Sequence, residues 1–343
     1  MTRISQSIRQ DILSGKYARD GKLPGVRQLA EYYSCSRGTI SNALRQLSDD
    51  GIIRTEHGRG CFLSGTQSPR RTSSRMIGAV LLWESWLEEM EELRDEYLKQ
   101  GWFVSVYCSS NDLQNPAAER RFLELAAEQN FAGVLITGTP IEPLNSGFYQ
   151  SLRCSGMKIV HLTNYKNDMT GEAAILPDYR MAGAIACSAA IMRGKKRIVM
   201  LSSTDTNPPS SQLRESGVRA MASALGAEIL PDIKLADWSE ISPEEVLKTL
   251  TAYGNLDDIA FLAHDCFRLG GVYDALRSTG IPENQLPFGI SMSDTHKLKN
   301  RMNHISFDYR QSIRMAMDYI LDENISPLDK FSHIMDPKLV MIS

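Results

Sequence analysis

The stretch Leu23–Leu63, LPGVRQLAEYYSCSRGTISNALRQLSDDGIIRTEHGRGCFL, decides the fold of the first part of this chain. It begins with apolar residues at helical spacing, passes through a polar break at 34–36 and continues with a polar and basic helical pattern. Two short strand patterns then flank a Gly-Arg-Gly turn. This order of helix, turn, helix and hairpin predicts a winged helix-turn-helix.

The second helix of this stretch has two different faces. Ser36 is placed to cap its N-terminus, and its apolar face carries Ile40, Ala43, Leu44 and Leu47. The opposite face carries short polar and cationic side chains, which suit an approach to base edges in a DNA major groove. These outward residues are Arg37, Gly38, Thr39, Ser41, Asn42 and Arg45. An earlier helix is predicted from Ile4, Ile8 and Ile12, and the hairpin strands from Ile52–Thr55 and Gly60–Leu63.

Charge is distributed unevenly along the 343 residues. Residues 1–75 carry 13 Lys and Arg against 6 Asp and Glu, a net charge of +7, whereas the remainder carries 25 against 35, a net charge of −10. A basic N-terminal segment on an acidic body suits a module that meets a polyanion, joined to one that does not.

The N-terminal residues resemble the GntR family of bacterial transcription factors. The resemblance rests on LPGVRQLA, SRGTISNAL and HGRG and covers residues 1–64. It implies that Arg27 and Arg37 contact phosphate and guanine, that Thr39 contacts the DNA backbone or a base, and that the His57-Gly58 wing enters the minor groove. Ser41 stands where the family often has Arg, so the resemblance does not imply a base preference at that step. The expected DNA-binding residues are Arg27, Ser36, Arg37, Thr39, Ser41, Asn42, Arg45, His57, Gly58 and Arg59.

Other classes of protein find little support. The six cysteines are scattered without a C-x-x-C pair, and the histidines lack metal-ligand spacing, so we expect reduced thiols and no metal site. The first residues lack the apolar core of a signal peptide, and no segment approaches 18 uncharged apolar residues. We therefore expect a cytoplasmic protein without membrane spans, and the sequence implies no cofactor.

From Met76 onward, strand and helix patterns alternate. Residues 65–75 have linker composition. Strands are predicted at Ile77–Leu82, Phe103–Tyr107, Gly133–Thr137, Ile159–Leu162, Ile198–Leu201, Ala227–Leu230, Ile259–Ala263 and Phe288–Ile290. Helices are predicted at Leu87–Gln100, Ala117–Gln129, Met181–Arg193, Gln212–Leu225, Pro243–Tyr253 and Leu269–Thr279. Alternation of this kind predicts an α/β body of parallel sheets. This body covers residues 76–343, and a segment of that length favours two lobes.

Ligands of such sheets bind beyond the carboxyl ends of the strands, so the residues that follow the strands are the candidates for a ligand site. Aromatic faces beside charged groups suit a polyhydroxylated ligand. A lone Trp is, however, more often a core residue than a ligand platform. The candidates are Trp83, Glu84, Trp86, Arg214, Trp238, His264, Asp265 and Ser293.

This second part resembles the effector domain of LacI-type repressors, which share the periplasmic sugar-binding-protein fold. The matching segments include PDYRMAGAIA, SSQLRESGVRAM, AHDCFRLGGVYDALRSTGIP and ISFDYRQSIRMAMDYIL, and ADWSEIS resembles the family's stretch with a sugar-stacking tryptophan. The resemblance implies that Trp238 stacks on the ligand, that Arg214 binds its hydroxyls, and that His264 and Asp265 hold its far side. Two departures lie in the expected pocket, His264-Asp265 for Asn-Asp and Ser291–Asp294 for Gly-x-Asp-Asp, so the resemblance implies the class of ligand but not its identity.

Together the two parts look like the arabinose-repressor subgroup. We therefore expect an effector-responsive, homodimeric regulator that binds an inverted-repeat operator and is not an enzyme. The expected effector is a sugar that releases the protein from genes of carbohydrate uptake or catabolism. Three alternatives stay open: a purine-like co-repressor, a pyridoxal-phosphate-binding GntR-type protein, and an exported binding protein for transport. Neither the length available nor a lysine context favours the second, and the basic N-terminal segment does not fit the third.

Overall fold

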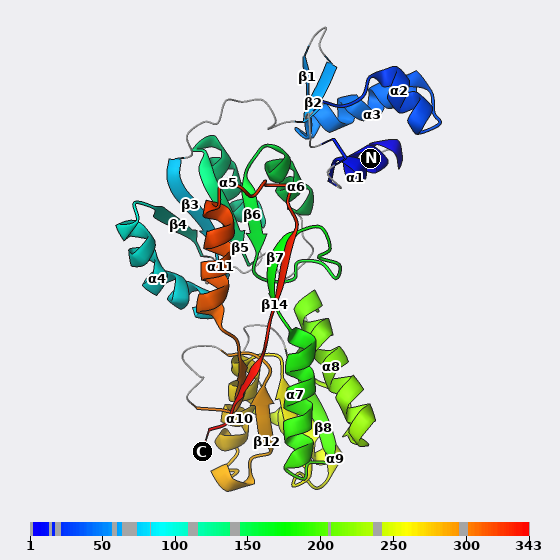
Figure 1. Ribbon diagram of the computed structural model, residues 1–343. Coiled ribbons are helices and arrows are strands. Elements are labelled where there is room, and N and C mark those ends of the chain that lie inside the picture. The colour runs from blue at the N-terminus through cyan, green and yellow to red at the C-terminus, as the bar shows by residue number, and fades with distance from the viewer. Residues whose placement is uncertain are drawn as a thin grey trace.

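The computed structural model describes residues 3–13, 16–17, 22–56, 60–63, 74–82, 84–108, 116–137, 145–204, 207–235, 242–294 and 301–342. Figure 1 shows a small N-terminal domain, here called the head, at one end of the molecule, followed by two α/β lobes. The first lobe lies next to the head and the second lobe lies at the far end. The predicted fold class, a winged helix-turn-helix followed by a two-lobed body with parallel sheets, is confirmed.

The head contains three helices and a hairpin. The helices are α1 (Arg3–Leu13), α2 (Val26–Tyr32) and α3 (Arg37–Asp49). The hairpin strands β1 (Ile53–Glu56) and β2 (Gly60–Leu63) pair antiparallel. The apolar face predicted for each helix packs into one shared core. Local periodicity therefore predicted this domain almost to the residue.

The first lobe is built on a parallel six-stranded sheet. Its strands, in spatial order, are β14 (Phe331–Met335), β7 (Ala173–Pro177), β6 (Lys158–His161), β5 (Phe131–Ile136), β3 (Ser74–Val80) and β4 (Phe103–Tyr107). Its helices are α4 (Glu84–Lys99), α5 (Pro116–Glu128), α6 (Ser146–Cys154) and α11 (Tyr309–Leu321). Strand β3 begins at Ser74, so the last two residues of the predicted linker belong to this sheet, and the rest of it lies outside the described residues.

The second lobe has a seven-stranded sheet. In spatial order its strands are β10 (Ile233–Leu235), β8 (Arg197–Ser203), β11 (Ile259–Ala263), β12 (Phe288–Ser291), β13 (His304–Ser306) and β15 (Lys338–Val340), with β9 (Glu228–Ile229) also paired to β8. Only β15 runs antiparallel to its neighbour. The helices are α7 (Tyr179–Met192), α8 (Pro209–Leu225), α9 (Pro243–Tyr253) and α10 (Cys266–Ser278), with a short 3-10 turn at Glu283–Gln285.

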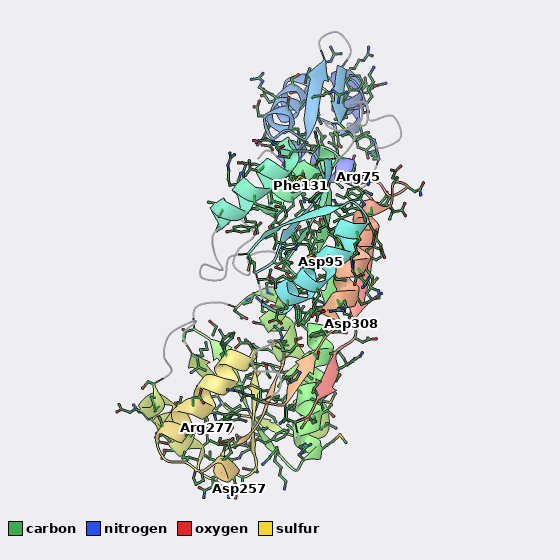
Figure 2. The ribbon with its side chains drawn as sticks, turned by 90° about the vertical axis from the view of Figure 1, so that its left-hand side faces the viewer. Arg75, Asp95, Phe131, Asp257, Arg277 and Asp308 are labelled. Atoms are coloured by element: carbon green, nitrogen blue, oxygen red, sulfur yellow. The ribbon has the colours of Figure 1, made fainter. Side chains whose placement is uncertain are left out.

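The chain passes between the two lobes at three places. It leaves the first lobe between β7 and α7, returns between β13 and α11, and leaves again between β14 and β15. In Figure 2, Asp308 marks the second of these passages, while Asp257 and Arg277 lie at the far end of the second lobe. None of the helices in the described ranges combines the length and apolar content that crossing a bilayer requires.

A buried ionic cluster lies in the first lobe, on the side facing the head. The Glu172 carboxylate accepts hydrogen bonds from Arg153 at 2.7 Å, from Tyr165 at 2.9 Å and from Lys166 at 2.7 Å. Burial would raise the pKa of Glu172, but the neighbouring His161, Lys166 and Arg153 together hold it below its ordinary value, so the carboxylate stays ionised. The cluster therefore fixes the start of β7 against the end of α6.

His161 lies beside this cluster, with its Nε2 4.0 Å from the Glu172 carboxylate. Its ring packs 5.2 Å from that of Tyr149 and 4.5 Å from that of Tyr165, and neither ring nitrogen has a hydrogen-bond partner among the described residues. Complete burial lowers the pKa of His161 to about 3, so the imidazole is neutral at physiological pH.

We expect that in His161→Phe the free energy of unfolding falls less steeply as the pH is lowered below 6.5. At pH 7 the variant should be as stable as the wild type. The folded-state pKa of His161 lies below the ordinary value of 6.5. Below pH 6.5 His161 becomes protonated in the unfolded chain but stays neutral in the folded chain. The wild type therefore loses about 1.4 kcal/mol of unfolding free energy per pH unit because of this residue. Urea unfolding at pH 7.5 and pH 5 measures the difference. Equal pH dependence of variant and wild type would contradict the prediction.

Candidate functional site

Helix α3 presents a polar face to solvent. Ser36 caps its N-terminus, because the Ser36 hydroxyl accepts a hydrogen bond from the Thr39 backbone N–H at 3.1 Å. Four of the predicted contact residues, Arg37, Ser41, Asn42 and Arg45, are exposed, and Thr39 is half-buried. The buried face is the predicted apolar one. A straight helix with this exposed stripe can enter a major groove. Contact of these residues with DNA stays a prediction.

The remaining predicted DNA contacts differ in what surrounds them. Arg27 is exposed and forms an ion pair with Glu31 at 3.2 Å, one turn further along α2. Such surface pairs contribute little to stability, so Arg27 is available to a phosphate group. The predicted wing-tip residues His57, Gly58 and Arg59 lie outside the described residues.

The C-terminal end of α3 is attached to the first lobe. Asp50 follows α3 directly; its carboxylate pairs with Arg9 of α1 at 3.2 Å, and its carbonyl accepts a hydrogen bond from Ser151 of α6 at 3.1 Å. Cys154, at the end of α6, is buried in the core of the head, and Leu328 packs against the same core. A movement of α6 would therefore be passed to the helix that carries the candidate DNA-binding residues.

The strand-end residues of the second lobe gather at one edge of the sheet, as predicted. The register of β8, β11 and β12 places Leu201, Ala263 and Ser291 in one row. His264 follows directly and lies 3.3 Å from the Glu215 carboxylate of α8. This contact with His264 is the largest factor that lowers the pKa of Glu215. A polar cavity of about 290 Å³ opens here, lined by Ser202, Ser203, Thr204, Asn207, Glu215, Asp232, Lys234 and His264.

Two further candidates in this lobe engage their own neighbours. The Ser293 hydroxyl donates to the His264 carbonyl at 3.1 Å. Asp265 caps the N-terminus of α10, accepting a hydrogen bond from the Arg268 N–H at 2.9 Å and pairing with the Arg268 guanidinium. Burial raises the pKa of Asp265. A role of either residue in ligand binding stays a prediction.

Arg214 lies where the two lobes meet. It is 8% exposed, its Nε donates to the Met292 carbonyl at 3.2 Å, and its guanidinium sits 4.1 Å from the centre of the Tyr179 ring. Burial raises the pKa of Tyr179, although the Arg214 charge opposes that shift. Asp294, close by, is buried and accepts a hydrogen bond from Ser306 at 2.9 Å. This arrangement places one guanidinium beside an aromatic ring. A role of Arg214 in binding a hydroxylated ligand stays a prediction.

The structure describes one of the three tryptophans predicted for the ligand site. Trp86 is described and only 2% exposed; its ring packs 4.6 Å from that of Tyr309 within the main core cluster. This packing is the core arrangement that the sequence left open as the alternative. Trp83, Trp238 and the side chain of Glu84 lie outside what the structure describes.

Sequence reasoning did not select Tyr179 and Tyr309 for the site. Each stands in an Asp-Tyr-Arg triplet, at 178–180 and at 308–310. In each triplet the Asp caps the helix that begins just after a passage between the lobes. Tyr179 then contacts Arg214, and Tyr309 contacts Trp86. The repeated triplet was the available signal, since it marks two of the three passages.

Comparison with known proteins gives consistent results for the two parts. Residues 1–63 match the family described as bacterial regulatory proteins, gntR family. The chain is 24% identical over 178 residues to the arabinose metabolism transcriptional repressor of Halalkalibacterium halodurans (48% of this chain, 46% of that protein). It is also 24% identical over 217 residues to the protein of the same name from Geobacillus stearothermophilus (62% and 58%). The chain thus spans about half the length of the curated relatives it matches.

A solved structure shares the fold of the body. The Cra transcriptional dual regulator from Pseudomonas putida, in complex with fructose 1-phosphate, superposes with a TM-score of 0.62 at 17% identity, over 78% of this chain and 99% of that one. LacI-type regulators from other bacteria give similar agreement, among them a periplasmic binding protein/LacI regulator of Alkaliphilus metalliredigens complexed with D-xylulofuranose (TM-score 0.60, 18% identity, 79% and 100%). The chain therefore carries a helix-turn-helix domain of the gntR family at its N-terminus, joined to a body with the two-lobed fold of LacI-type repressors.

Proposed function

We propose that this chain is an effector-responsive regulator of transcription and not an enzyme. The head binds an operator, and a small molecule held between the lobes changes that binding. The observation that carries the proposal is the exposed polar face of α3 in a gntR-type head. The residue that follows α3, Asp50, is hydrogen-bonded to the first lobe of the body through Ser151. A protein that acts on DNA in this way works in the bacterial cytoplasm.

We further propose that it represses genes of carbohydrate uptake or catabolism and leaves its operator when a sugar binds. The names of the relatives, arabinose metabolism repressors, and the sugar ligands of the solved structures support this class of effector. The candidate contacts are Arg214 and the strand-end residues His264 and Ser293. A ligand that prefers the closed lobes shifts the equilibrium by its differential affinity, and the link between Asp50 and Ser151 passes the change to α3.

A homodimer completes the proposal. One head reads only a half-site, so two heads on an inverted repeat, spaced near one helical turn or a multiple, supply the specificity that phosphate contacts alone lack.

The proposal is tested with a panel of mono- and disaccharides, together with purine bases and nucleosides, in a thermal-shift experiment. A ligand at 100 times its dissociation constant stabilises the protein by about 2.7 kcal/mol, which such an experiment detects. Binding to a DNA site selected from a random pool is then measured with and without each stabilising compound. Release by a sugar supports the proposal. Tighter DNA binding with a purine would make the protein a co-repressed regulator, and an absorbing chromophore at visible wavelengths would indicate pyridoxal phosphate.

Within this model, Arg37→Ala and Arg27→Ala should weaken DNA binding in different ways. Arg37 is exposed in the first turn of α3, and loss of a bidentate contact to guanine should cost about 1–3 kcal/mol and relax preference at one base pair. Arg27→Ala should weaken binding to all sequences alike and flatten its salt dependence. Fluorescence anisotropy on the selected site and on single-base variants measures both effects, and sedimentation of the same complex gives the number of chains bound. Wild-type affinity in both variants would remove α3 from the DNA interface.

A further inference from the structure

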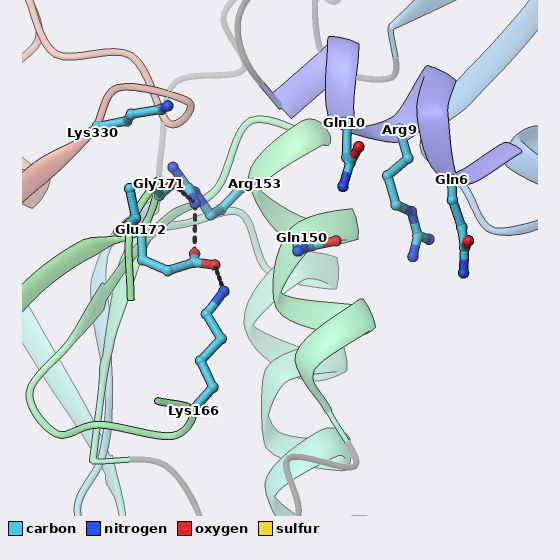
Figure 3. Close-up of a pocket in the computed structure, with 10 residues that line it drawn as sticks. Gln6, Arg9, Gln10, Gln150, Arg153, Lys166, Gly171, Glu172 and Lys330 are labelled. Carbon is cyan, nitrogen blue, oxygen red and sulfur yellow. Dashed lines mark hydrogen bonds and ion pairs between the residues drawn. The ribbon is translucent and has the colours of Figure 1, made fainter. Parts of the chain in front are cut away.

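A second cavity lies at the joint between the head and the first lobe. It measures about 570 Å³, and Figure 3 shows side chains from α1 on one wall facing those of α6 and the loop before β7 on the other. Its lining is Gln6, Arg9 and Gln10 from the head, with Gln150, Arg153, Lys166, Thr170, Gly171, Glu172 and Lys330 from the first lobe. We call it the joint cavity. It is separate from the strand-end cavity of the second lobe, with which it shares no lining residue.

The wall that belongs to the first lobe is a built structure. Arg153 is 3% exposed and donates to the carbonyls of Pro327 at 2.9 Å and Gly171 at 3.1 Å, as well as to Glu172. Both carboxylate oxygens of Glu172 are occupied by donors, as Figure 3 shows for Arg153 and Lys166. The one acidic group of the lining is therefore neutralised in place. It is fixed without help from a ligand.

Several side chains at the opening between the two walls can contact a ligand. Of the four cationic side chains of the lining, Arg9 pairs with Asp50, and Arg153 and Lys166 pair with Glu172. Lys330 is the cation of the lining that forms no ion pair within the described ranges. The structure records no hydrogen bond or ion pair for the side chains of Gln6, Gln10, Gln150 and Lys330 within the described ranges. Carboxamides both donate to and accept from hydroxyl groups, and an ammonium group binds phosphate as a point charge. This combination favours a ligand with a phosphate at one end and several hydroxyls.

We propose that the joint cavity is a second ligand site, which takes a small phosphorylated, hydroxyl-rich metabolite. The ligand bridges α1 and α6 and so holds the head on the first lobe. Since α1 shares the core that also fixes α3, the bound ligand restricts the orientation of the candidate DNA-binding face. The site is independent of the strand-end cavity, and the inference requires nothing of the effector proposed above.

The test uses the full-length chain and fructose 1,6-bisphosphate as the probe, titrated by calorimetry. We expect one molecule per chain in the wild type and an affinity lower by about tenfold or more in Lys330→Gln, since that change removes a charge-assisted bond. Gln150→Met should also weaken binding. Fructose, which lacks phosphate, should bind much more weakly to this site. Lys248→Gln is the matched control, because Lys248 is exposed on α9 in the second lobe. It should bind like the wild type.

Two other locations of the probe would overturn the proposal. Loss of binding in Arg214→Met but not in Lys330→Gln would place the probe between the lobes. Loss in Arg37→Ala would place it on the DNA-binding face. No binding at millimolar probe, or equal binding by Lys330→Gln and the wild type, would also overturn it. Hydrogen exchange gives a second readout: the probe should slow exchange in α1 and α6 together, and slowing confined to either helix contradicts a bridging ligand.

Discussion

Gly217→Ala should lower the free energy of unfolding by about 3 kcal/mol or more, a large value for a single methyl group. Helices α7 and α8 cross with their backbones in direct contact. A Cβ on Gly217 would lie 1.9 Å from the Arg180 carbonyl oxygen, and one on Gly183 would lie 2.1 Å from the Arg214 carbonyl oxygen. Both obstructing atoms are backbone, so no side-chain rotation relieves the overlap and the helices must separate. Urea unfolding followed by circular dichroism measures the loss.

Gly147→Ala provides the matched control. Gly147 also lies in a helix, α6, but a Cβ there would meet no atom within 4 Å. The change should be neutral or stabilise by up to about 1 kcal/mol, because alanine is the better helix former. Equal stabilities of the two variants would show that α7 and α8 separate readily. Separation would also displace Arg214, so Gly217→Ala is expected to impair effector binding along with stability.

Arg214→Met should reduce affinity for the inducing sugar by about 100-fold or more, since two or more charge-assisted hydrogen bonds of about 1.5–3 kcal/mol each would be lost. Methionine keeps an unbranched side chain against the Tyr179 ring, which limits the loss of packing. Operator affinity without sugar should stay within about twofold of the wild type, because Arg214 is remote from the head. The result would be a repressor that sugar no longer releases. Titration of sugar against the protein–DNA complex measures this.

Arg219→Met tests whether the effect is specific to the site. Arg219 lies on the same helix but is exposed, so its replacement should leave sugar affinity unchanged. Arg214 also donates to the Met292 carbonyl, so a purely structural role is the competing explanation. A lower melting temperature with unchanged sugar affinity in Arg214→Met would establish that role and remove Arg214 from the ligand site.

The head and the parallel arrangement of the sheets could be predicted from the sequence, because their signals are local. Apolar positions at helical spacing, the capping Ser36 and the glycines of the wing specify α3 and the hairpin without reference to the rest of the chain. The same holds for β4, β11 and α9, whose predicted bounds agree with the structure. Parallel order then follows from alternation of strand and helix, and it placed His264 and Ser293 at one sheet edge.

Segments whose partners lie far away in the sequence were not predicted. Strand β14 exposes three of its five residues, so it lacks the apolar run of a central strand; its pairing with β7, more than 150 residues earlier, makes it a strand. Helix α11 joins the first lobe for the same kind of reason. No local pattern in residues 307–335 predicts that this segment returns to the sheet that the chain left at Pro177.

The sequence by itself determined the two parts of this protein, the kind of DNA-binding domain and the edge of the second sheet at which His264 and Ser293 lie. Periodicity and capping depend on residues that are close in sequence. The contacts that they specify therefore cost little loop-closure entropy to form. Only the tertiary structure decided that Trp86 packs in the core, that Arg214 meets Tyr179, and that α1 and α6 enclose the joint cavity. Each of these contacts depends on how two separately folded faces are brought together, and side-chain packing between them sets that arrangement.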